Sequence, residues 1–286
     1  FFHTLDFAPA ISYFYFPSDG GGGLPEGCEN ILRKVNIPIA MSKYAQQQSK
    51  EIYDISTEYI PHGVNTKRFY KVSDDEKLGI KRKWGLEGKF VIGVVARNQP
   101  RKMLDQTIRV ASEICKMHDD IIFFMHCDPF DNAALFNLIS LITRYNLQNR
   151  FIFSGMKFYN TFHYSQMNEI YNLFDVLLST TSGEGFGITT IEALSCQVPV
   201  VITNYTTTKE IILDNGQCGE TVNLACEVTG NWLVDRAVID VKDCVERLER
   251  LYLNSSLRIK YGEVGRKKCE EFYDWSNTVI PMWHEL

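Results

Sequence analysis

The amino-acid sequence predicts an α/β protein with two doubly wound domains, each built on a parallel sheet. Apolar runs such as KFVIGVVA (89–96) alternate with helical stretches, as expected for strands covered by helices on both faces. Two such series occur along the chain, separated by a polar, charged stretch. A glycine-rich turn, GEGFG (183–187), follows a strand late in the second series. We therefore expect the second domain to bind a ligand at the carboxyl ends of its strands.

The first series, residues 1–72, forms the predicted N-terminal domain. Its order is strand, helix, strand, helix, strand, which is about half of a doubly wound domain, so we expect this domain to be truncated. The glycine content of PSDGGGGLPEG (17–27) predicts a flexible loop. The strands are predicted at AISYFYF (10–16), IPIAMS (37–42) and STEYIPHGV (56–64), and the helices at 26–34 and 42–54.

The second series, residues 89–272, forms the predicted C-terminal domain. Residues 73–88 before it are polar and charged, and they form the predicted linker, with a helix over 75–84. The tail from Val238 onward is predicted to be helical. Helices are predicted at 104–117, 133–145 and 165–174, and strands at 89–96, 121–128, 150–155, 176–180 and 198–203.

Composition narrows the class of protein. The chain has 286 residues, 45% of them hydrophobic, and a formal net charge of -5, which gives no support to nucleic-acid binding, since that needs a basic domain or stripe. Eight cysteines without CxxC spacing indicate free thiols in a reducing compartment. The apolar FAPAISYFYF (7–16) is too short to span a bilayer and lacks the basic segment of a signal peptide. We therefore expect a cytoplasmic protein. A peripheral contact with a membrane stays open.

The GEGFGITTIE stretch (183–192) is typical of a phosphate site. Its alternating glycines allow a ligand to approach the backbone, and the helix that starts near Ile188 offers free amides and a positive dipole end. A dinucleotide site of a dehydrogenase is disfavoured. The spacing is GxGxG rather than GxGxxG, and the next strand ends at Asn204 rather than at an acidic residue.

Two glutamates flank this turn. Glu184 lies within it, and Glu192 lies one turn inside the following helix, where a carboxylate can accept hydrogen bonds from a ribose diol. The alternative is a strained turn with two solvated glutamates.

A second motif, VVARNQPRK (94–102), follows the first strand of the same domain. Arg97 leaves the strand end and Lys102 follows at a helix start, with Arg101 beside it; two cations there would neutralise a pyrophosphate. A solvated basic loop is the alternative. The sequence contains no D-x-D motif, so we expect no bound metal, with Arg and Lys neutralising the phosphates instead. His126 is interpreted as a hydrogen-bonded histidine at a strand end rather than as a catalytic group.

Four segments in this order resemble a known family: YIPHGVNTKRF (59–69), VVARNQPRK, EIYNLFDVLLSTTSGEGFG (169–187) and ITTIEALSCQVPVV (188–201). They are similar to the retaining, nucleotide-sugar-dependent glycosyltransferases of family 4 (glycosyl transferases group 1), which have the GT-B fold. The resemblance runs from about Ile37 to the C-terminus. It implies two Rossmann-like domains, and a C-terminal helix (273–286) that crosses back to the first one.

The resemblance also implies roles for the residues of the two motifs. Arg97 and Lys102 would hold the donor diphosphate, Glu192 the ribose hydroxyls, and Glu184 the transferred sugar near the reacting centre. Glu184, Arg97 and Lys102 are thus the expected catalytic residues. The backbone of Gly185, Phe186 and Gly187, together with Thr189, would line the pocket. The loop NYTTTKE (204–210) departs from the family, which often has a Gly-Gly pair there.

The implied activity is transfer of a hexosyl group from a nucleotide-diphosphate sugar to an acceptor hydroxyl, with retention of anomeric configuration. No cofactor is expected besides this co-substrate, and a GDP-sugar is slightly favoured over a UDP-sugar. The acceptor would be a carbohydrate, or linked to a lipid or protein, and the sequence does not indicate an oligomeric state. The alternatives are a nucleotide-sugar-binding module without transferase activity, and a GT-B epimerase or phosphorylase.

Overall fold

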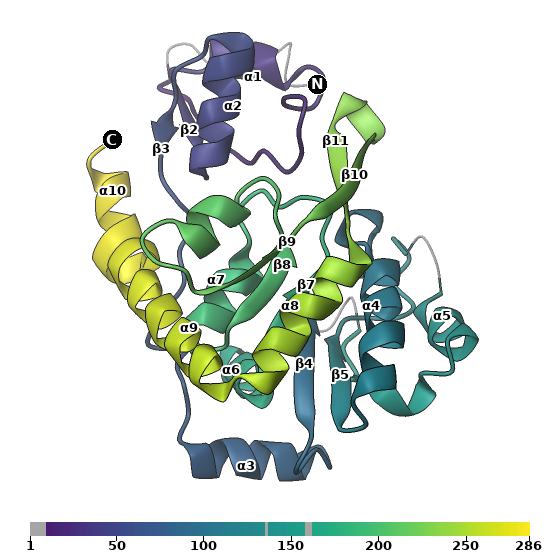
Figure 1. The fold of residues 1–286 in the computed structure, drawn as a ribbon. Helices are drawn as coiled ribbons and strands as arrows, with labels where there is room; N and C mark the ends of the chain where they lie inside the picture. The colour runs from purple at the N-terminus through teal and green to yellow at the C-terminus, as the bar shows by residue number, and fades with distance from the viewer. Residues whose placement is uncertain (1–9, 135–136, 158–161) are drawn as a thin grey trace.

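The computed structural model shows two α/β units, a small one that contains β1–β3 and a larger one below it in Figure 1. The structure describes residues 10–134, 137–157 and 162–286. Residues 1–9 of the predicted first domain and 135–136 of the predicted helix 133–145 lie outside that part.

The small unit has a three-stranded parallel sheet in the order β1-β2-β3. The expected alternation of strands and helices is present, but the third strand, predicted over 56–64, is only two residues long. The side chain of Ser42 caps α2 by accepting a hydrogen bond from the Ala45 amide, which fixes where that helix begins. The elements are β1 (Tyr13–Phe16), α1 (Cys28–Lys34), β2 (Ile37–Ala40), α2 (Lys43–Tyr53) and β3 (Glu58–Tyr59).

The large unit has a six-stranded parallel sheet in the order β6-β5-β4-β7-β8-β9. The order reverses between β4 and β7, and doubly wound sheets bind their ligands outside the carboxyl ends of the strands at such a point. The strands are β4 (Phe90–Val95), β5 (Ile121–His126), β6 (Phe151–Phe153), β7 (Val176–Ser179), β8 (Val200–Thr203) and β9 (Gly219–Val222).

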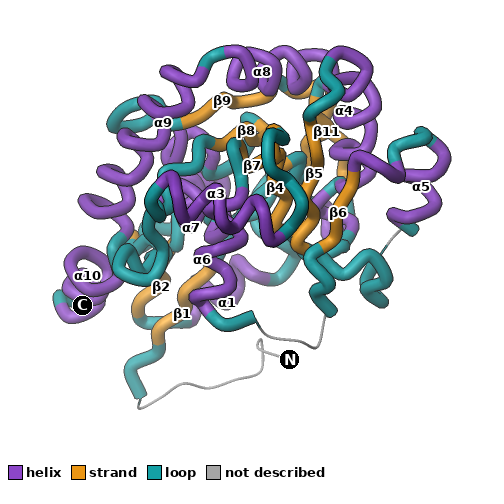
Figure 2. The backbone as a smooth tube through the Cα atoms, turned by 90° about the horizontal axis from the view of Figure 1, so that it is seen from below, coloured by secondary structure: helices purple, strands orange, loops and turns teal. Residues whose placement is uncertain are grey.

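Helices cover both faces of this sheet, as the continuous apolar strands predict. In Figure 2, α4 and α8 cover one face of the sheet, and α3, α6 and α7 cover the other. Each face has its own core: Ile92 and Phe123 face the α4–α8 side, whereas Val91 and Phe124 face the other. The helices are α4 (Leu104–Met117), α5 (Leu138–Arg144), α6 (Tyr164–Leu173), α7 (Ile188–Ser195), α8 (Val241–Leu253) and α9 (Ser255–Lys268).

An antiparallel hairpin, β10 (Leu224–Thr229) and β11 (Asp235–Ile239), projects from the large unit. The sequence analysis did not identify it. In the described residues, short 3-10 segments (Pro100–Lys102, Gln148–Arg150 and Asn231–Leu233) and a π-helical segment (Lys209–Leu213) join other elements.

Residues 73–88, the predicted linker, contain α3 (Asp74–Lys83), which begins with a capping box of Ser73 and Glu76. The helix lies against α6, and Lys81 bonds Asp175, whose side chain is 15% exposed, at 2.7 Å. This segment is therefore attached to the large unit.

The C-terminal segment runs from α9 back to the small unit. Two π-helical turns (Cys269–Tyr273 and Trp275–Val279) lead to α10 (Ile280–His284), and Val279 packs with Ile39 and Ile60 beside the first sheet. In Figure 1 this yellow segment rises along one side to the small unit. Within the described ranges, none of the helices is long and apolar enough to cross a membrane.

The buried ion pairs of Asp175 yield a stability prediction. Burial raises the pKa of Asp175, but the ammonium groups of Lys77 and Lys81, 3.0 and 2.7 Å away, more than offset it and hold this pKa below its usual value. We expect Asp175→Ala to lower the free energy of unfolding by about 3–5 kcal/mol at pH 7, because it leaves two largely buried cations without their partner. Urea denaturation measures this. The contribution is present above the carboxyl's unfolded pKa of about 3.9 and is lost as pH falls through the lower folded pKa.

Glu169→Ala is the matched control, since it breaks the exposed Lys83–Glu169 pair, which joins α3 to α6. Exposed pairs contribute about 1 kcal/mol or less. Equal losses in the two variants would contradict the assignment of Asp175 as the anchor of α3.

Candidate functional site

The two sequence motifs meet at the carboxyl edge of the large sheet. The VVARNQPRK loop leaves β4 and the glycine turn leaves β7, the two strands between which the order reverses. Helix α7 begins directly after the turn, with Gly187 in the left-handed region at φ 103°. In the described part of the chain, no side chain caps this helix start, so its first amides keep the capacity to bind an anion.

Glu184 is the centre of a buried ion cluster. Its carboxylate accepts a hydrogen bond from the Lys102 ammonium on one oxygen, and its other oxygen lies 3.2 Å from the Arg101 guanidinium. Arg101 also donates to the carbonyl of Gly183 at 2.6 Å. The cluster thus joins the loop after β4 to the turn after β7.

Burial and charge pairing act in opposite directions on the groups of this cluster. Burial raises the pKa of Glu184, but Lys102 and Arg101 more than offset this effect and hold that pKa below its usual value. Burial also lowers the pKa of Lys102, against the attraction of Glu184. An added phosphate would face a cation that is already desolvated, where an electrostatic contact is stronger than in water.

Arg97 does not join the cluster. It forms a bidentate pair with Asp131, at 2.8 Å from Nε and 3.1 Å from Nη2, and Asp131 lies in the loop after β5. The hydrogen bonds from Arg97 are the main reason that the pKa of Asp131 is lowered. The structure therefore brings Lys102 and Glu184 together, with Arg101 rather than Arg97 as the second cation.

Glu192 stands one turn into α7, apart from the cluster. The hydroxyl of the fully buried Tyr171 donates to it at 2.6 Å, and this bond fixes the direction of the carboxylate. Burial raises the pKa of Glu192 above its usual value, and the Tyr171 bond opposes that shift.

Phe186 contributes only its backbone to the glycine turn. Its side chain is 3% exposed and packs against Tyr273 and His62, with ring centroids 5.6 and 6.0 Å apart. Thr189, in the first turn of α7, is half-buried. The Phe186 ring is thus part of the core, and the role of its backbone in lining a pocket stays a prediction.

The threonine loop that departs from the family supports the turn. Thr206 accepts from the Glu184 amide at 3.0 Å and donates to the Glu184 carbonyl at 2.9 Å, and Thr207 donates to the Phe186 carbonyl at 2.9 Å. These hydroxyls hold the backbone on either side of Gly185. The sequence analysis noted the departure but did not assign this role.

The small unit covers the turn with the loop predicted to be flexible. The carbonyl of Asp19 is so close to Gly183 that a Cβ there would lie 1.9 Å from it, and a Cβ at Gly185 would lie 2.5 Å from Pro17. The Asp19 carboxylate lies 3.3 Å from Arg101 and 3.1 Å from Arg236. The loop is thus packed on the site, and both glycines are required for this approach.

The sequence analysis missed five side chains that complete the site: Asp19, Asp131, Tyr171, Thr206 and Arg236. Their partners are distant in sequence, so spacing could not reveal them. Only Asp19 carried a signal, as an acidic residue within a glycine tract that directly follows a strand.

His126 has a structural role. Its Nδ1 lies 2.9 Å from the Ser154 hydroxyl, and burial lowers its pKa to about 4, so the ring is neutral at pH 7. Elsewhere in the described residues, no group of three or more His, Cys, Asp or Glu side chains is arranged to hold a metal ion.

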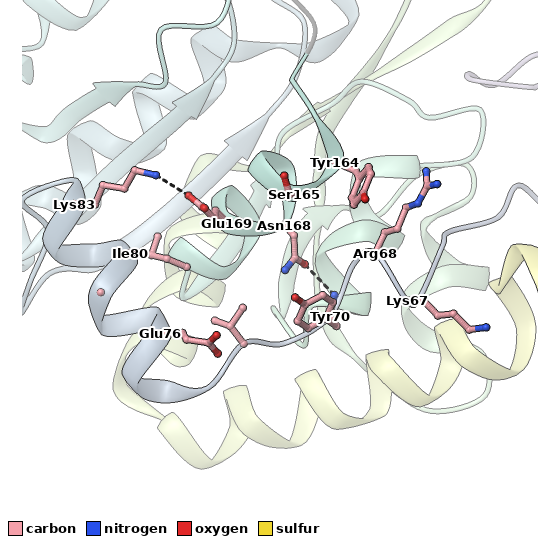
Figure 3. Close-up of a pocket in the computed structure, with 12 residues that line it drawn as sticks. Lys67, Arg68, Tyr70, Glu76, Ile80, Lys83, Tyr164, Ser165, Asn168 and Glu169 are labelled. Atoms are coloured by element: carbon pink, nitrogen blue, oxygen red, sulfur yellow. Dashed lines mark hydrogen bonds and ion pairs between the residues drawn. The ribbon is translucent and has the colours of Figure 1, made fainter.

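A groove of about 550 Å³ lies apart from this site, between α3 and α6 (Figure 3). The Arg68 guanidinium lies over the Tyr164 ring at 4.5 Å, and the Lys83–Glu169 pair spans the groove. None of the predicted donor-binding residues lines it.

Comparison with known proteins places the chain in a family. The family described as glycosyl transferases group 1 matches residues 76–268. The α-monoglucosyldiacylglycerol synthase of Acholeplasma laidlawii is 27% identical over 222 residues, which cover 75% of this chain and 51% of that protein. The D-inositol 3-phosphate glycosyltransferase of Corynebacterium jeikeium is 26% identical over 278 residues, which cover 94% of this chain and 62% of that protein. The aligned part is thus between half and two-thirds of these relatives' length.

Solved structures share the fold. Sucrose-phosphate synthase from Thermosynechococcus elongatus superposes with a TM-score of 0.77 at 17% identity, over 96% of this chain and 67% of that one. Anabaena Alr3699/HepE, solved in complex with UDP and glucose, superposes with a TM-score of 0.73 at 16% identity, over 96% of this chain and 70% of that one. With the family match across two-thirds of its length and this architecture of two Rossmann-like units, the chain belongs to the glycosyl transferases group 1 family and has the GT-B fold.

Proposed function

We propose that this protein transfers a hexosyl group from a nucleotide-diphosphate sugar to an acceptor hydroxyl. One observation carries the proposal: a buried Lys102–Glu184–Arg101 cluster lies beside the start of α7, where the strand order reverses. A cation and a helix start suit a diphosphate, and a neighbouring carboxylate suits sugar hydroxyls. Together they match a ligand that has a diphosphate at one end and a sugar at the other.

Each group then has a role. Lys102 and the first amides of α7 hold the diphosphate, and Glu192, oriented by Tyr171, accepts hydrogen bonds from the ribose hydroxyls. Glu184 contacts the transferred sugar. Arg97, which lies in the same loop as Lys102 and pairs with Asp131, also contacts the diphosphate.

In the proposed reaction, the bond between the anomeric carbon and the leaving phosphate oxygen breaks. The acceptor oxygen bonds to the same face of that carbon, and its proton passes to the leaving phosphate oxygen. Lys102 and the α7 dipole stabilise the negative charge that develops on the diphosphate, which is the main catalytic contribution. Retention rests on the family resemblance, and proton NMR of the fresh product's anomeric signal tests it directly.

The alternatives make different assay predictions. A binding module without transferase activity would bind nucleoside diphosphates but release no sugar. An epimerase would alter the donor sugar without an acceptor, and a phosphorylase would need inorganic phosphate. Product analysis with UDP- and GDP-sugars, with and without acceptor, together with a glycan incubated with inorganic phosphate, separates these four functions.

Nucleoside diphosphates are expected to stabilise the protein. At about 100 times the dissociation constant, a ligand that binds only the native state adds about 2.7 kcal/mol, or roughly 5–10 °C in melting temperature for a chain of this size. We expect Lys102→Ala and Glu192→Ala to lose most of this shift, because they remove a phosphate contact and the ribose contact. A thermal-shift panel of GDP and UDP measures it, and the larger shift identifies the base; we expect GDP.

Lys83→Ala is the matched control, since Lys83 is an exposed lysine in an ion pair outside the site. An unchanged shift in both Lys102→Ala and Glu192→Ala would contradict the assignment of the donor site.

Transfer should depend on the cations. We expect Lys102→Ala and Arg97→Ala each to lower the turnover rate at saturating donor by about 10²-fold or more, by analogy with the loss of one preorganised donor. Initial rates of sugar release measure this, and circular dichroism checks folding. A turnover rate within about twofold of the unmodified protein in both variants would contradict electrostatic stabilisation of the leaving group.

Nucleotide affinity should fall in acid. The ionised Glu192 accepts hydrogen bonds from the ribose, and its pKa is raised by burial, so protonation begins at a higher pH than for an exposed glutamate. Affinity is therefore full above this pKa and decreases as pH falls through it. Calorimetric titration with GDP or UDP across pH 4 to 8 measures the change, and Glu192→Gln should remove this pH-dependent component. A pH profile identical in Glu192→Gln and the unmodified protein would contradict the role of Glu192.

A further inference from the structure

A second cavity adjoins the ion cluster, under the β10–β11 hairpin. It measures about 570 Å³, and Arg101 and Ser182 form the wall that it shares with the glycine turn. Asp19 comes from the small unit, and Arg236 and Trp232 come from the hairpin. The cavity therefore lies between the two units, where ligand sites are common, and its size is that of a small-molecule site.

The hairpin is fixed in place by both units. The Ala237 amide donates to the Ser182 carbonyl at 3.0 Å, and Gly21 and Asp235 exchange two backbone hydrogen bonds at 3.0 and 2.9 Å. The Tyr205 hydroxyl also donates to the Glu227 carboxylate of β10 at 2.7 Å. The base of the hairpin is thus part of the site rather than a free extension.

The hairpin tip holds two large apolar side chains in water. Trp232 is 70% exposed and Leu233 is 73% exposed, and both have left-handed backbones, with φ of 59° and 58°. Bulky residues rarely adopt this conformation, and such strain concentrates at functional sites. Trp232 lines the cavity, whereas Leu233 does not.

The cavity that Trp232 lines also has polar side chains that can both donate and accept hydrogen bonds. The Asp19 carboxylate, 3.3 Å from Arg101 and 3.1 Å from Arg236, is an acceptor between two guanidinium donors. These groups retain some exposure, with 30%, 26% and 20% of the Asp19, Arg101 and Arg236 side chains accessible. The cavity thus combines a flat aromatic surface with hydrogen-bonding groups of both kinds.

We infer that this cavity is the binding subsite for a saccharide acceptor, with a pyranose ring stacked on Trp232 and its hydroxyls bonded to Asp19, Arg101 and Arg236. A pyranose has an apolar C–H face and a polar rim, and it matches these two walls. A lipid chain would leave the charged wall without polar partners. This inference rests on the proposed function, because the shared Arg101 connects the cavity to the carboxylate that contacts the donor sugar.

The test compares Trp232→Ala with Leu233→Ala, an equally exposed neighbour outside the cavity. Binding of methyl glycosides of glucose, galactose, mannose and N-acetylglucosamine is measured by saturation-transfer NMR, without any donor present. We expect Trp232→Ala to weaken glycoside binding about 10-fold, as for loss of one aromatic anchor, and Leu233→Ala and Trp232→Phe to bind as the unmodified protein does.

Kinetics supply the second readout. Trp232→Ala should raise the KM for the glycoside acceptor about 10-fold, whereas Leu233→Ala should leave it unchanged. The inference is overturned if the unmodified protein binds none of the glycosides, or if Trp232→Ala binds them normally. Equal losses in both alanine variants would also overturn it. If both variants instead lose binding to phosphatidylglycerol vesicles while glycoside binding is intact, the tip is a membrane contact and the inference is wrong.

Failure of the proposed function has a different signature. In that case GDP and UDP produce no thermal shift and no sugar is released, whatever the glycosides do. A normal nucleotide response with no role for Trp232 would instead refute the subsite alone.

Discussion

The ion cluster of Lys102, Arg101 and Glu184 is the interaction on which the rest of the candidate site depends. A carboxylate in this buried position requires partners, and both partners come from the loop after β4. The cluster therefore fixes the glycine turn against that loop, and Thr206 holds the same turn from the other side. The position of the turn sets where α7 begins, and so where its dipole and free amides lie.

The alternating glycines serve contact between the units as much as contact with a ligand. Any side chain at Gly183 or Gly185 would collide with Asp19 or Pro17 of the small unit. The sequence pattern alone suggests room for a phosphate, whereas the structure shows the backbone carbonyl of Asp19 packed on Gly183 and the ring of Pro17 packed on Gly185. Gly187, which begins α7, is the glycine whose left-handed conformation is required by the turn itself.

Local sequence patterns predicted most helices and strands of the large unit. The features that these patterns did not predict depend on exposed strands or on contacts between residues distant in sequence. The helix predicted at 104–117 has these bounds, because its apolar face and the strands around it are strongly periodic. The hairpin was missed because β10 is largely exposed and gives no apolar signal. The choice of Arg101 over Arg97 at Glu184 was not predictable. It depends on the short 3-10 turn at Pro100–Lys102, and on Asp131, which binds Arg97 from another loop.

The same charged groups hold the units together and line the site. Asp19 bonds Arg101, which bonds Glu184, and Glu210 of the large unit accepts from the amide of Lys43 at the start of α2. Burial raises the pKa of Glu210 to about 7, so this second contact is only partly ionised at neutral pH. Contacts of this polar kind between units permit relative motion. An anionic donor that binds Lys102 changes the charge around Arg101, and hence its attraction to Asp19. Under the proposed function, donor binding is therefore coupled to the packing of the small unit on the site. Donor binding changes the free energy of this packing, and the packing changes the free energy of donor binding by the same amount.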